Sequence, residues 1–223
     1  KKLNTFYDDS LSTVSLPITG TEYRHRVWPL LLQGFDSNKA TLTFKMIMML
    51  AIHIIQTNPL LERALQMTYS YVFLDEFQDT TTLQYAFVKE CFLGSNVKIT
   101  AVGDNKQRIM LWAGAMRGIF KTFHQEFEPY GVRLLMNHRS APKLVSLQKA
   151  MYTSLKERTT DVKVPDKWKT DEGDITLVIA EKESAEATTI VSDIVNRIST
   201  GIQANDICIL CKELPHKYTL QII

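Results

Sequence analysis

Apolar positions along the chain change between helical and strand-like spacing, and this change predicts a mixed α/β fold. Apolar residues from Ile47 to Ile54 recur three and four positions apart, behind Thr43, which is suited to cap a helix. We expect this helix to be mostly buried. A second helix is expected from Pro59 to Gln66, since proline is favoured at the first helical positions. The apolar run Tyr71 to Leu74 is typical of a strand covered on both faces.

The next segment continues as helix and then strand. Thr81 and Gln84 have the spacing of a capping box, which predicts a helix carrying Leu83, Phe87 and Cys91. A further strand is expected at 97–102, ended by a Gly-Asp turn. Strand, helix and strand in this order predict a parallel sheet, and such sheets bind ligands at the carboxyl ends of their strands.

The second half of the chain repeats this order. Short strands are expected at 132–136, 175–180 and 207–210, with one helix at about 141–155 and another with Ile190, Ile194 and Ile198 on one face, stopped by Gly201. This half is therefore predicted to hold a second strand-helix-strand unit.

Turn residues divide the chain into three parts. Residues 128–131 read Glu-Pro-Tyr-Gly and predict a hinge. Residues 1–40 show no lasting period, and we expect irregular structure there with one short helix near 27–32. The predicted boundaries are 1–40, 41–130 and 131–223.

Composition narrows the class of protein. The 223 residues include 26 Lys and Arg against 24 Asp and Glu, so no strongly basic field covers the molecule. Three cysteines cannot form a disulfide framework, which indicates a reducing compartment, and we expect the cytoplasm. The longest apolar run, 46–55, is too short to span a bilayer, so no membrane partner is expected.

Two acidic residues follow the first predicted strand. Asp75 and Glu76 would lie at the ligand-binding edge of the sheet, where one carboxylate can hold Mg²⁺ and the other can orient an attacking water. Acidic residues also end strands and cap helices without any catalytic role, and for an isolated Asp-Glu pair that alternative is the more common one. A second polar strand end, Val102 to Gln107, followed by Trp112, favours the catalytic interpretation.

Three segments resemble motifs of one enzyme family. Leu74-Asp75-Glu76-Phe77-Gln78-Asp79-Thr80 and Val102-Gly103-Asp104-Asn105-Lys106-Gln107 resemble motifs II and III of the superfamily 1 helicases of the UvrD/Rep/PcrA type, and Leu135-Met136-Asn137-His138-Arg139-Ser140 looks like their motif IV. The resemblance extends from about residue 41 to the C-terminus. It implies parts of two RecA-like parallel-sheet motor domains, with ATP bound between 41–130 and 131–223.

The resemblance assigns a role to each matching residue. Asp75 would hold Mg²⁺, Glu76 would be the general base for the water that attacks the γ-phosphate, and Gln107 would sense that phosphate. Arg139 would act as an arginine finger from the second domain, and His138 would stack on adenine where the family usually has Tyr. The cofactors implied are ATP and Mg²⁺.

The resemblance also implies a nucleic-acid track. Trp112 would stack on a base of single-stranded DNA or of a single/double-strand junction, with movement from 3′ to 5′. Without the resemblance, a Trp in a sequence such as Met110-Leu111-Trp112 is more often a core residue. Ala113 stands where the family usually carries Arg, and Met110 where it carries an aromatic residue, so contacts with the track are expected to be fewer.

Some family motifs are missing from the sequence. No Gly-x-x-x-x-Gly-Lys-[Ser/Thr] phosphate loop occurs, and the late helicase motifs are absent. We therefore expect an internal fragment of an ATP-dependent DNA helicase, inactive alone, with residues 1–40 as a remnant of an accessory subdomain. The alternative is a helicase-derived DNA-binding or scaffold module that has lost catalysis. Cys208 and Cys211 are expected to be buried thiols rather than metal ligands, and His53 a core histidine.

Overall fold

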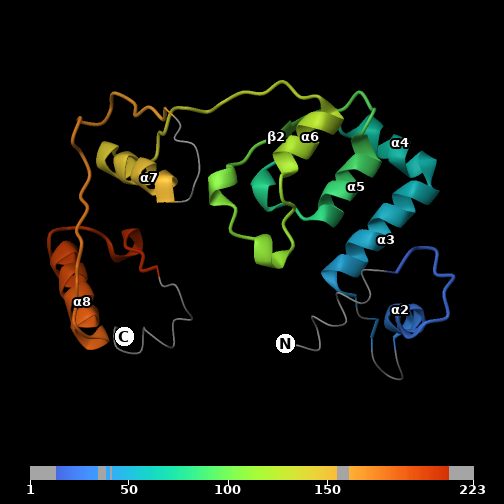
Figure 1. The fold of residues 1–223 in the computed structure, drawn as a ribbon, viewed down its shortest axis with the longest axis horizontal. Helices are drawn as coiled ribbons and strands as arrows, with labels where there is room; N and C mark the ends of the chain where they lie inside the picture. Colours follow the sequence, from blue (N-terminus) through green and yellow to red (C-terminus); the bar gives the residue numbers. More distant parts are fainter. Residues whose placement is uncertain (1–13, 35–38, 41, 155–160, 211–223) are drawn as a thin grey trace. The chain divides into compact units, whose positions relative to one another are not determined.

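The computed structural model describes residues 14–34, 39–40, 42–154 and 161–210. These residues fall into two compact units, divided between Leu134 and Leu135. Figure 1 follows the chain through helices α2 to α6 in the first unit and α7 and α8 in the second. Each unit is described by itself below.

The first unit begins with two helices that share a small core. Helix α2 spans Tyr23–Gln33 and α3 spans Phe44–Thr57. Trp28 of α2 and Met46 of α3 are fully buried against Val14. Helix α2 is therefore longer than the short helix predicted near 27–32, because burial of Trp28 supplies the stabilisation that its irregular apolar pattern does not reveal.

Helix α3 begins as the sequence predicts but is less buried than expected. The Thr43 side chain accepts a hydrogen bond from Met46 N–H, which confirms the cap. Met46 and Ile55 are its buried residues, whereas Ile47 and Ile54 remain almost half exposed. The prediction of a mostly buried helix is wrong because Phe44, Ile47 and Ile54 stay exposed, and most of the other apolar residues of α3 are only half-buried.

Helix α4 follows directly, over Pro59–Thr68, two residues longer than predicted. Asn58 caps it by accepting a hydrogen bond from Leu61 N–H at 3.2 Å. In the described part of the chain no single helix is both long enough and apolar enough to cross a membrane; α3 and α4 pass that test only as a pair bent by 100°.

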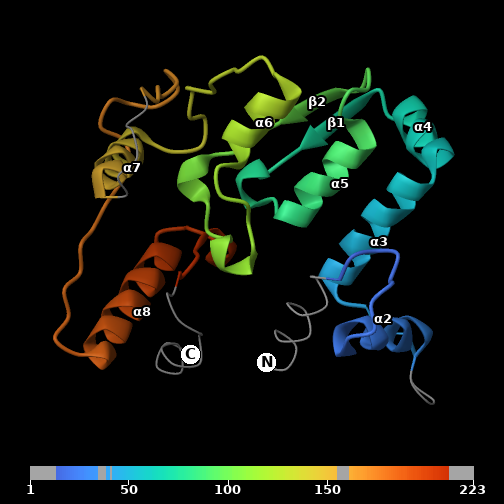
Figure 2. The same cartoon turned by 45° about the vertical axis from the view of Figure 1, so that its right-hand side comes forward.

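A parallel two-stranded sheet forms the centre of the first unit. Strand β1 spans Tyr71–Leu74 and β2 spans Lys98–Ala101, joined by helix α5, Thr82–Phe92. Tyr71 pairs with Lys98 and Leu74 with Ala101, which confirms the predicted strand-helix-strand unit. Figure 2 shows the two strands side by side, near α5 and α6. The mixed α/β class with a parallel sheet is thus borne out in this unit.

One face of this sheet carries the core. Phe77 is fully buried and makes edge-to-face contacts with Phe120 and Phe123 of α6, which spans Ile119–Phe127. On the opposite face Tyr71 is 67% and Phe73 73% exposed. The prediction that β1 is covered on both faces is wrong, because the described helices pack against one face alone.

Helix α5 confirms the predicted capping box. The Thr81 hydroxyl accepts from Gln84 N–H at 3.3 Å, and the Gln84 side chain accepts from Thr81 N–H at 2.8 Å. The two bonds satisfy donors that a helix N-terminus otherwise leaves unpaired. They fix the start of α5 two residues after the turn that follows β1.

The second unit contains two long helices and little strand pairing. Helix α7 spans Pro142–Ser154 and α8 spans Glu183–Ser199, with Gly201 ending α8 at a positive φ as predicted. Within 135–154 and 161–210 the one extended pairing is an isolated parallel bridge between Met136 and Lys163.

The strands predicted at 132–136, 175–180 and 207–210 are not formed in the described residues. The second strand-helix-strand unit is therefore a wrong prediction for this chain. A strand needs a neighbour for its backbone groups, and local apolar spacing cannot supply one.

Candidate functional site

Two turns lie next to each other at the carboxyl ends of β1 and β2. Backbone pairing continues past both strands: Val102 N–H donates to Leu74 O at 2.8 Å, and Phe77 N–H donates to Val102 O at 2.9 Å. These two bonds bring the acidic turn after β1 against the turn after β2. The arrangement is the one that parallel sheets use to bind ligands.

The acidic turn is held in an unusual backbone conformation. Glu76 has φ 47° and ψ 40°, in the left-handed region, although it is not a glycine. Asp75 Oδ1 accepts a hydrogen bond from Glu76 N–H at 2.8 Å, and both side chains are exposed. Such a conformation costs roughly 1–3 kcal/mol, and strain of this kind gathers at functional sites.

A buried amide joins the acidic turn to the turn after β2. Gln78 is 1% exposed and is the one buried polar residue in the described chain. Its Nε2 donates to Glu76 Oε2 at 2.6 Å, and its Oε1 accepts from Asp104 N–H at 3.0 Å. Both hydrogen-bonding ends of the amide are therefore used, one on each turn.

Asp104 organises the second turn. Its carboxylate accepts from Lys106 N–H and from Lys106 Nζ, each at 3.0 Å, and from Gln107 Nε2 at 3.3 Å. Burial opposes ionisation of this carboxyl, but the bonds from Lys106 and Gln107 outweigh it and hold the pKa of Asp104 below its usual value. The amide of Gln107 is in this way held beside a charged carboxylate.

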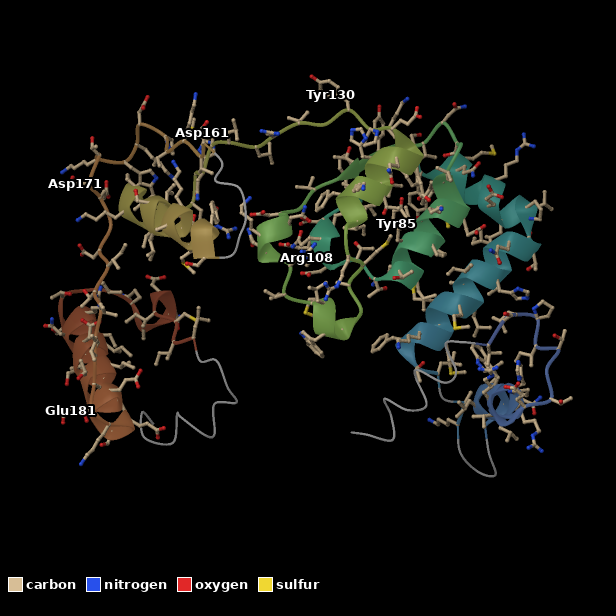
Figure 3. All side chains as sticks on the ribbon, viewed as in Figure 1. Tyr85, Arg108, Tyr130, Asp161, Asp171 and Glu181 are labelled. Atoms are coloured by element: carbon tan, nitrogen blue, oxygen red, sulfur yellow. The ribbon has the colours of Figure 1, made fainter. Side chains whose placement is uncertain are left out.

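Trp112 lies in the loop that follows. It belongs to a short 3₁₀ helix, Leu111–Ala113, and is 83% exposed, so the core alternative for this residue is wrong. The loop is tied to the acidic turn, because Asp79 Oδ1 accepts from Met110 N–H at 3.3 Å. Figure 3 labels Arg108 at the start of this loop.

His138 and Arg139 belong to the second unit, and the structure describes them within it. The Asn137 side chain accepts from Arg139 N–H at 3.0 Å and from Ser140 N–H at 2.9 Å, which forms a tight polar turn. The His138 carbonyl accepts from Lys167 Nζ at 2.8 Å. Both His138 and Arg139 have exposed side chains.

The structure gives less support for a functional role of the remaining candidate residues. In the described part of the chain, no three His, Cys, Asp or Glu side chains are grouped to hold a metal. Cys208 is exposed, so the expected buried thiol is wrong there, and Cys211 lies outside the described residues. His53 is half-buried rather than in the core. Asp75 would offer a single carboxylate, which fits Mg²⁺ because that ion is held by one or two carboxylates together with phosphate oxygens and waters.

Sequence reasoning missed the connecting residues of this site. Gln78 and Asp104 were not among the predicted site residues, nor was Gly103, whose absent side chain makes room for the Gln78 amide: a Cβ there would collide with Gln78 Oε1 and lie 3.0 Å from Phe77 N. A Gln two residues after the acidic pair that follows β1 was the available signal, but its two partners are set by strand pairing.

Part of this chain matches a known protein family. Residues 18–128 match the UvrD/REP helicase N-terminal domain. The chain is 27% identical over 157 residues to DNA helicase II of Haemophilus influenzae, covering 70% of this chain and 21% of that protein.

Two further relatives are also DNA helicases that the chain matches over part of their length. The chain is 31% identical to the ATP-dependent DNA helicase PcrA of Leuconostoc citreum, covering 68% of this chain and 20% of that protein. It is 33% identical to the ATP-dependent DNA helicase Rep of Escherichia coli, covering 47% of this chain and 16% of that protein. The chain therefore spans about a fifth of the length of these relatives. The chain is thus a distant relative of the UvrD/Rep/PcrA helicases, and its residues 18–128 match the UvrD/REP helicase N-terminal domain.

Proposed function

We propose that this chain is part of an ATP-dependent DNA helicase, in which the turns after β1 and β2 form one side of the ATP-hydrolysis site. The observation that carries the proposal is the pair of exposed carboxylates at the end of β1, linked by Gln78 to the turn that bears Gln107. Carboxylates that merely ended a strand would not need a left-handed backbone or a buried amide beside them.

Glu76 is the proposed general base. Its carboxylate takes a proton from the attacking water, the water oxygen bonds to the γ-phosphorus, and the bond from that phosphorus to the β–γ bridging oxygen breaks, which leaves ADP and phosphate. A positioned base of this kind contributes roughly 10²- to 10⁴-fold in rate. Gln107 is proposed to contact the γ-phosphate through its amide, which lies at the exposed edge of the same site.

Asp75 is the proposed Mg²⁺ ligand. One of its oxygens accepts the Glu76 N–H, and this bond orients the carboxylate at the end of the strand. Magnesium bound there would neutralise charge on the β- and γ-phosphates. No other described residue is assigned to the ion.

Residues 41–130 and 131–223 are proposed to belong to two RecA-like motor domains, with residues 1–40 from an accessory subdomain. Arg139 is proposed as an arginine finger from the second domain; fingers contribute about 10³- to 10⁵-fold in related phosphoryl transfers. His138 is proposed to stack on adenine. The hydrogen-bonded turn around Asn137 supports both roles, because the two side chains that it carries are exposed.

Trp112 is the proposed contact with single-stranded DNA. An indole that is largely exposed on a loop anchored to the acidic turn is placed to stack on a base, which is worth about 1–3 kcal/mol. We also propose that the helicase moves from 3′ to 5′ on the DNA, takes part in DNA repair and acts in the cytoplasm.

The second candidate function is a DNA-binding or scaffold module without catalysis. Ala113 and Met110, beside Trp112, favour it because they remove groups that the helicase resemblance places at the track. The strained Glu76 and its bond to Gln78 oppose it, since a scaffold would not need this geometry.

The two functions differ in DNA-stimulated ATP hydrolysis. We expect the full-length protein to which this chain belongs to release phosphate from ATP faster when single-stranded DNA is added. The 223-residue chain alone, which has no phosphate loop, is the matched negative control. A full-length protein that binds single-stranded DNA but hydrolyses no ATP with or without it would contradict the helicase proposal and support the scaffold.

A further inference from the structure

We propose that Gln78 is a positioning residue that fixes the Glu76 carboxylate and couples it to the turn bearing Gln107. The inference rests on the proposed function for the role of Glu76, but the coupling itself is read from contacts in the first unit. It concerns a residue that would touch neither ATP nor the attacking water.

The orientation of the Gln78 amide follows from its partners. A carboxylate oxygen can only accept a hydrogen bond and a backbone N–H can only donate one. Nε2 must therefore face Glu76 and Oε1 must face Asp104, as they do at 2.6 Å and 3.0 Å. A flipped amide would lose both bonds, so the side chain has one stable orientation.

The surroundings of Gln78 leave it no freedom to move alone. Phe77 beside it is fully buried in the aromatic core. The amide of Gln78 packs against Gly103, where a methyl group would collide with Gln78 Oε1. Asp79, one residue further, accepts the Met110 N–H. Gln78 is thus fixed from the β1 side by the core and from the β2 side by backbone.

The amide bridges the two strand ends through a short connected path. Glu76 Oε2 accepts a hydrogen bond from Gln78 Nε2, and Gln78 Oε1 accepts one from Asp104 N–H. The Asp104 carboxylate in turn accepts a hydrogen bond from Gln107 Nε2 at 3.3 Å. A shift of the second turn, such as a γ-phosphate at Gln107 would cause, therefore moves the Asp104 N–H donor that orients the Gln78 amide. The carboxylate of Glu76 would follow, so base alignment and phosphate sensing are linked.

The structural alternative is that Gln78 only fills a buried space. A second bridging amide in the same unit serves as the matched control. Gln66 Nε2 donates to Glu62 Oε1 at 2.9 Å and to Cys91 O at 2.8 Å, and so joins α4 to α5 away from the strand ends. Replacement of Gln66 by Met removes a comparable bridge without touching the two turns.

Two replacements of Gln78 separate its two bonds. Gln78→Met removes both while keeping the side-chain length. Gln78→Glu keeps an acceptor for the Asp104 N–H but loses the donor to Glu76 and places a second carboxylate beside it. Both should lower kcat of DNA-stimulated ATP hydrolysis about 100-fold, with KM for ATP changed less than about threefold, because misplacement of a reacting group by about 1 Å costs that much.

Hydrogen exchange of the Asp104 amide supplies a readout independent of catalysis. In the 223-residue chain it should speed up in Gln78→Met and stay slow in Gln78→Glu, whatever the function of the protein. Wild-type kcat in Gln78→Glu, or an equal loss of kcat in Gln66→Met, would overturn the positioning role. Unchanged exchange of Asp104 in Gln78→Met would overturn the coupling, whereas absence of ATP hydrolysis in the wild type would refute the proposed function and leave the exchange result standing.

Discussion

The two units of this chain carry the same predicted order of strand, helix and strand, and among the described residues only the first unit forms it. In the first unit β1 and β2 pair over four residues and α5 packs beside them. In the second unit, 175–180 and 207–210 flank a well-formed α8, and neither segment pairs with another described residue as a strand. The helices form in both units, so the difference lies in the strands.

The difference follows from what each element needs. A helix satisfies its backbone hydrogen bonds internally, whereas a strand depends on a neighbour. Leu177 and Ile179, in the middle of the predicted strand, are 83% and 87% exposed. Their apolar side chains have no covered face in the described residues, and the segment stays irregular although its sequence has strand propensity.

Removing the central core residue of the first unit should give the largest effect. Phe77→Ala deletes a fully buried ring that contacts Phe120, Phe123 and Tyr85, and should lower the free energy of unfolding by about 3–5 kcal/mol. Urea unfolding of the 223-residue chain, followed by circular dichroism, measures this loss.

The matched variant lies in the second unit. Val145→Ala removes two methyl groups from a residue of α7 that is also buried. It should cost about 1–3 kcal/mol and leave amide exchange in β1 and β2 unchanged. Loss of β1 and β2 protection in Val145→Ala as great as in Phe77→Ala would show that the two units do not fold as separate bodies.

A smaller effect is expected from the ionic contact between α5 and α6. Glu126 accepts from Lys89 Nζ and from the Tyr85 hydroxyl, each at 2.6 Å, and Figure 3 labels Tyr85 beside these helices. The bonds from Lys89 and Tyr85 outweigh burial and lower the pKa of Glu126. A lowered pKa contributes stability above the unfolded-state pKa of about 4.3, and this contribution is lost as the pH falls through the folded-state value.

Glu126→Gln should therefore lower the free energy of unfolding by about 1 kcal/mol at pH 7. This difference in free energy from wild type should shrink as the pH falls below about 4. Thermal unfolding across this range measures it. Asp193→Asn is the control in the second unit: it breaks an exposed ion pair with Arg197 within α8 and should change the free energy of unfolding less than Glu126→Gln does. A constant difference between Glu126→Gln and wild type at every pH would contradict the ionic contact.

Local signals in the sequence explain what was predicted correctly. The capping box at Thr81 and Gln84 and the cap at Thr43 involve residues three positions apart, so spacing alone predicts them. The acidic pair and the Gly-Asp turn were predicted at strand ends for the same reason.

What the sequence could not provide depends on contacts between distant residues. The bond between Gln78 and Asp104 spans 26 positions and exists because β1 and β2 are in register. The left-handed backbone of Glu76 is stabilised by the packed turn around it, since a Glu does not favour that conformation by itself. Exposure of Tyr71 and Phe73 likewise depends on which helices cover the sheet.

The rate of DNA-stimulated ATP hydrolysis in a Glu76→Gln full-length protein tests the central claim most directly. The matched control is Glu90→Gln. Glu90 is an exposed residue of α5 whose side chain accepts a hydrogen bond from Gln56. We predict that Glu76→Gln lowers kcat about 10²- to 10⁴-fold while ATP binding and DNA binding stay close to wild type, and that Glu90→Gln changes neither. Turnover in Glu76→Gln equal to that of Glu90→Gln would remove Glu76 from the base role and contradict the account of this site.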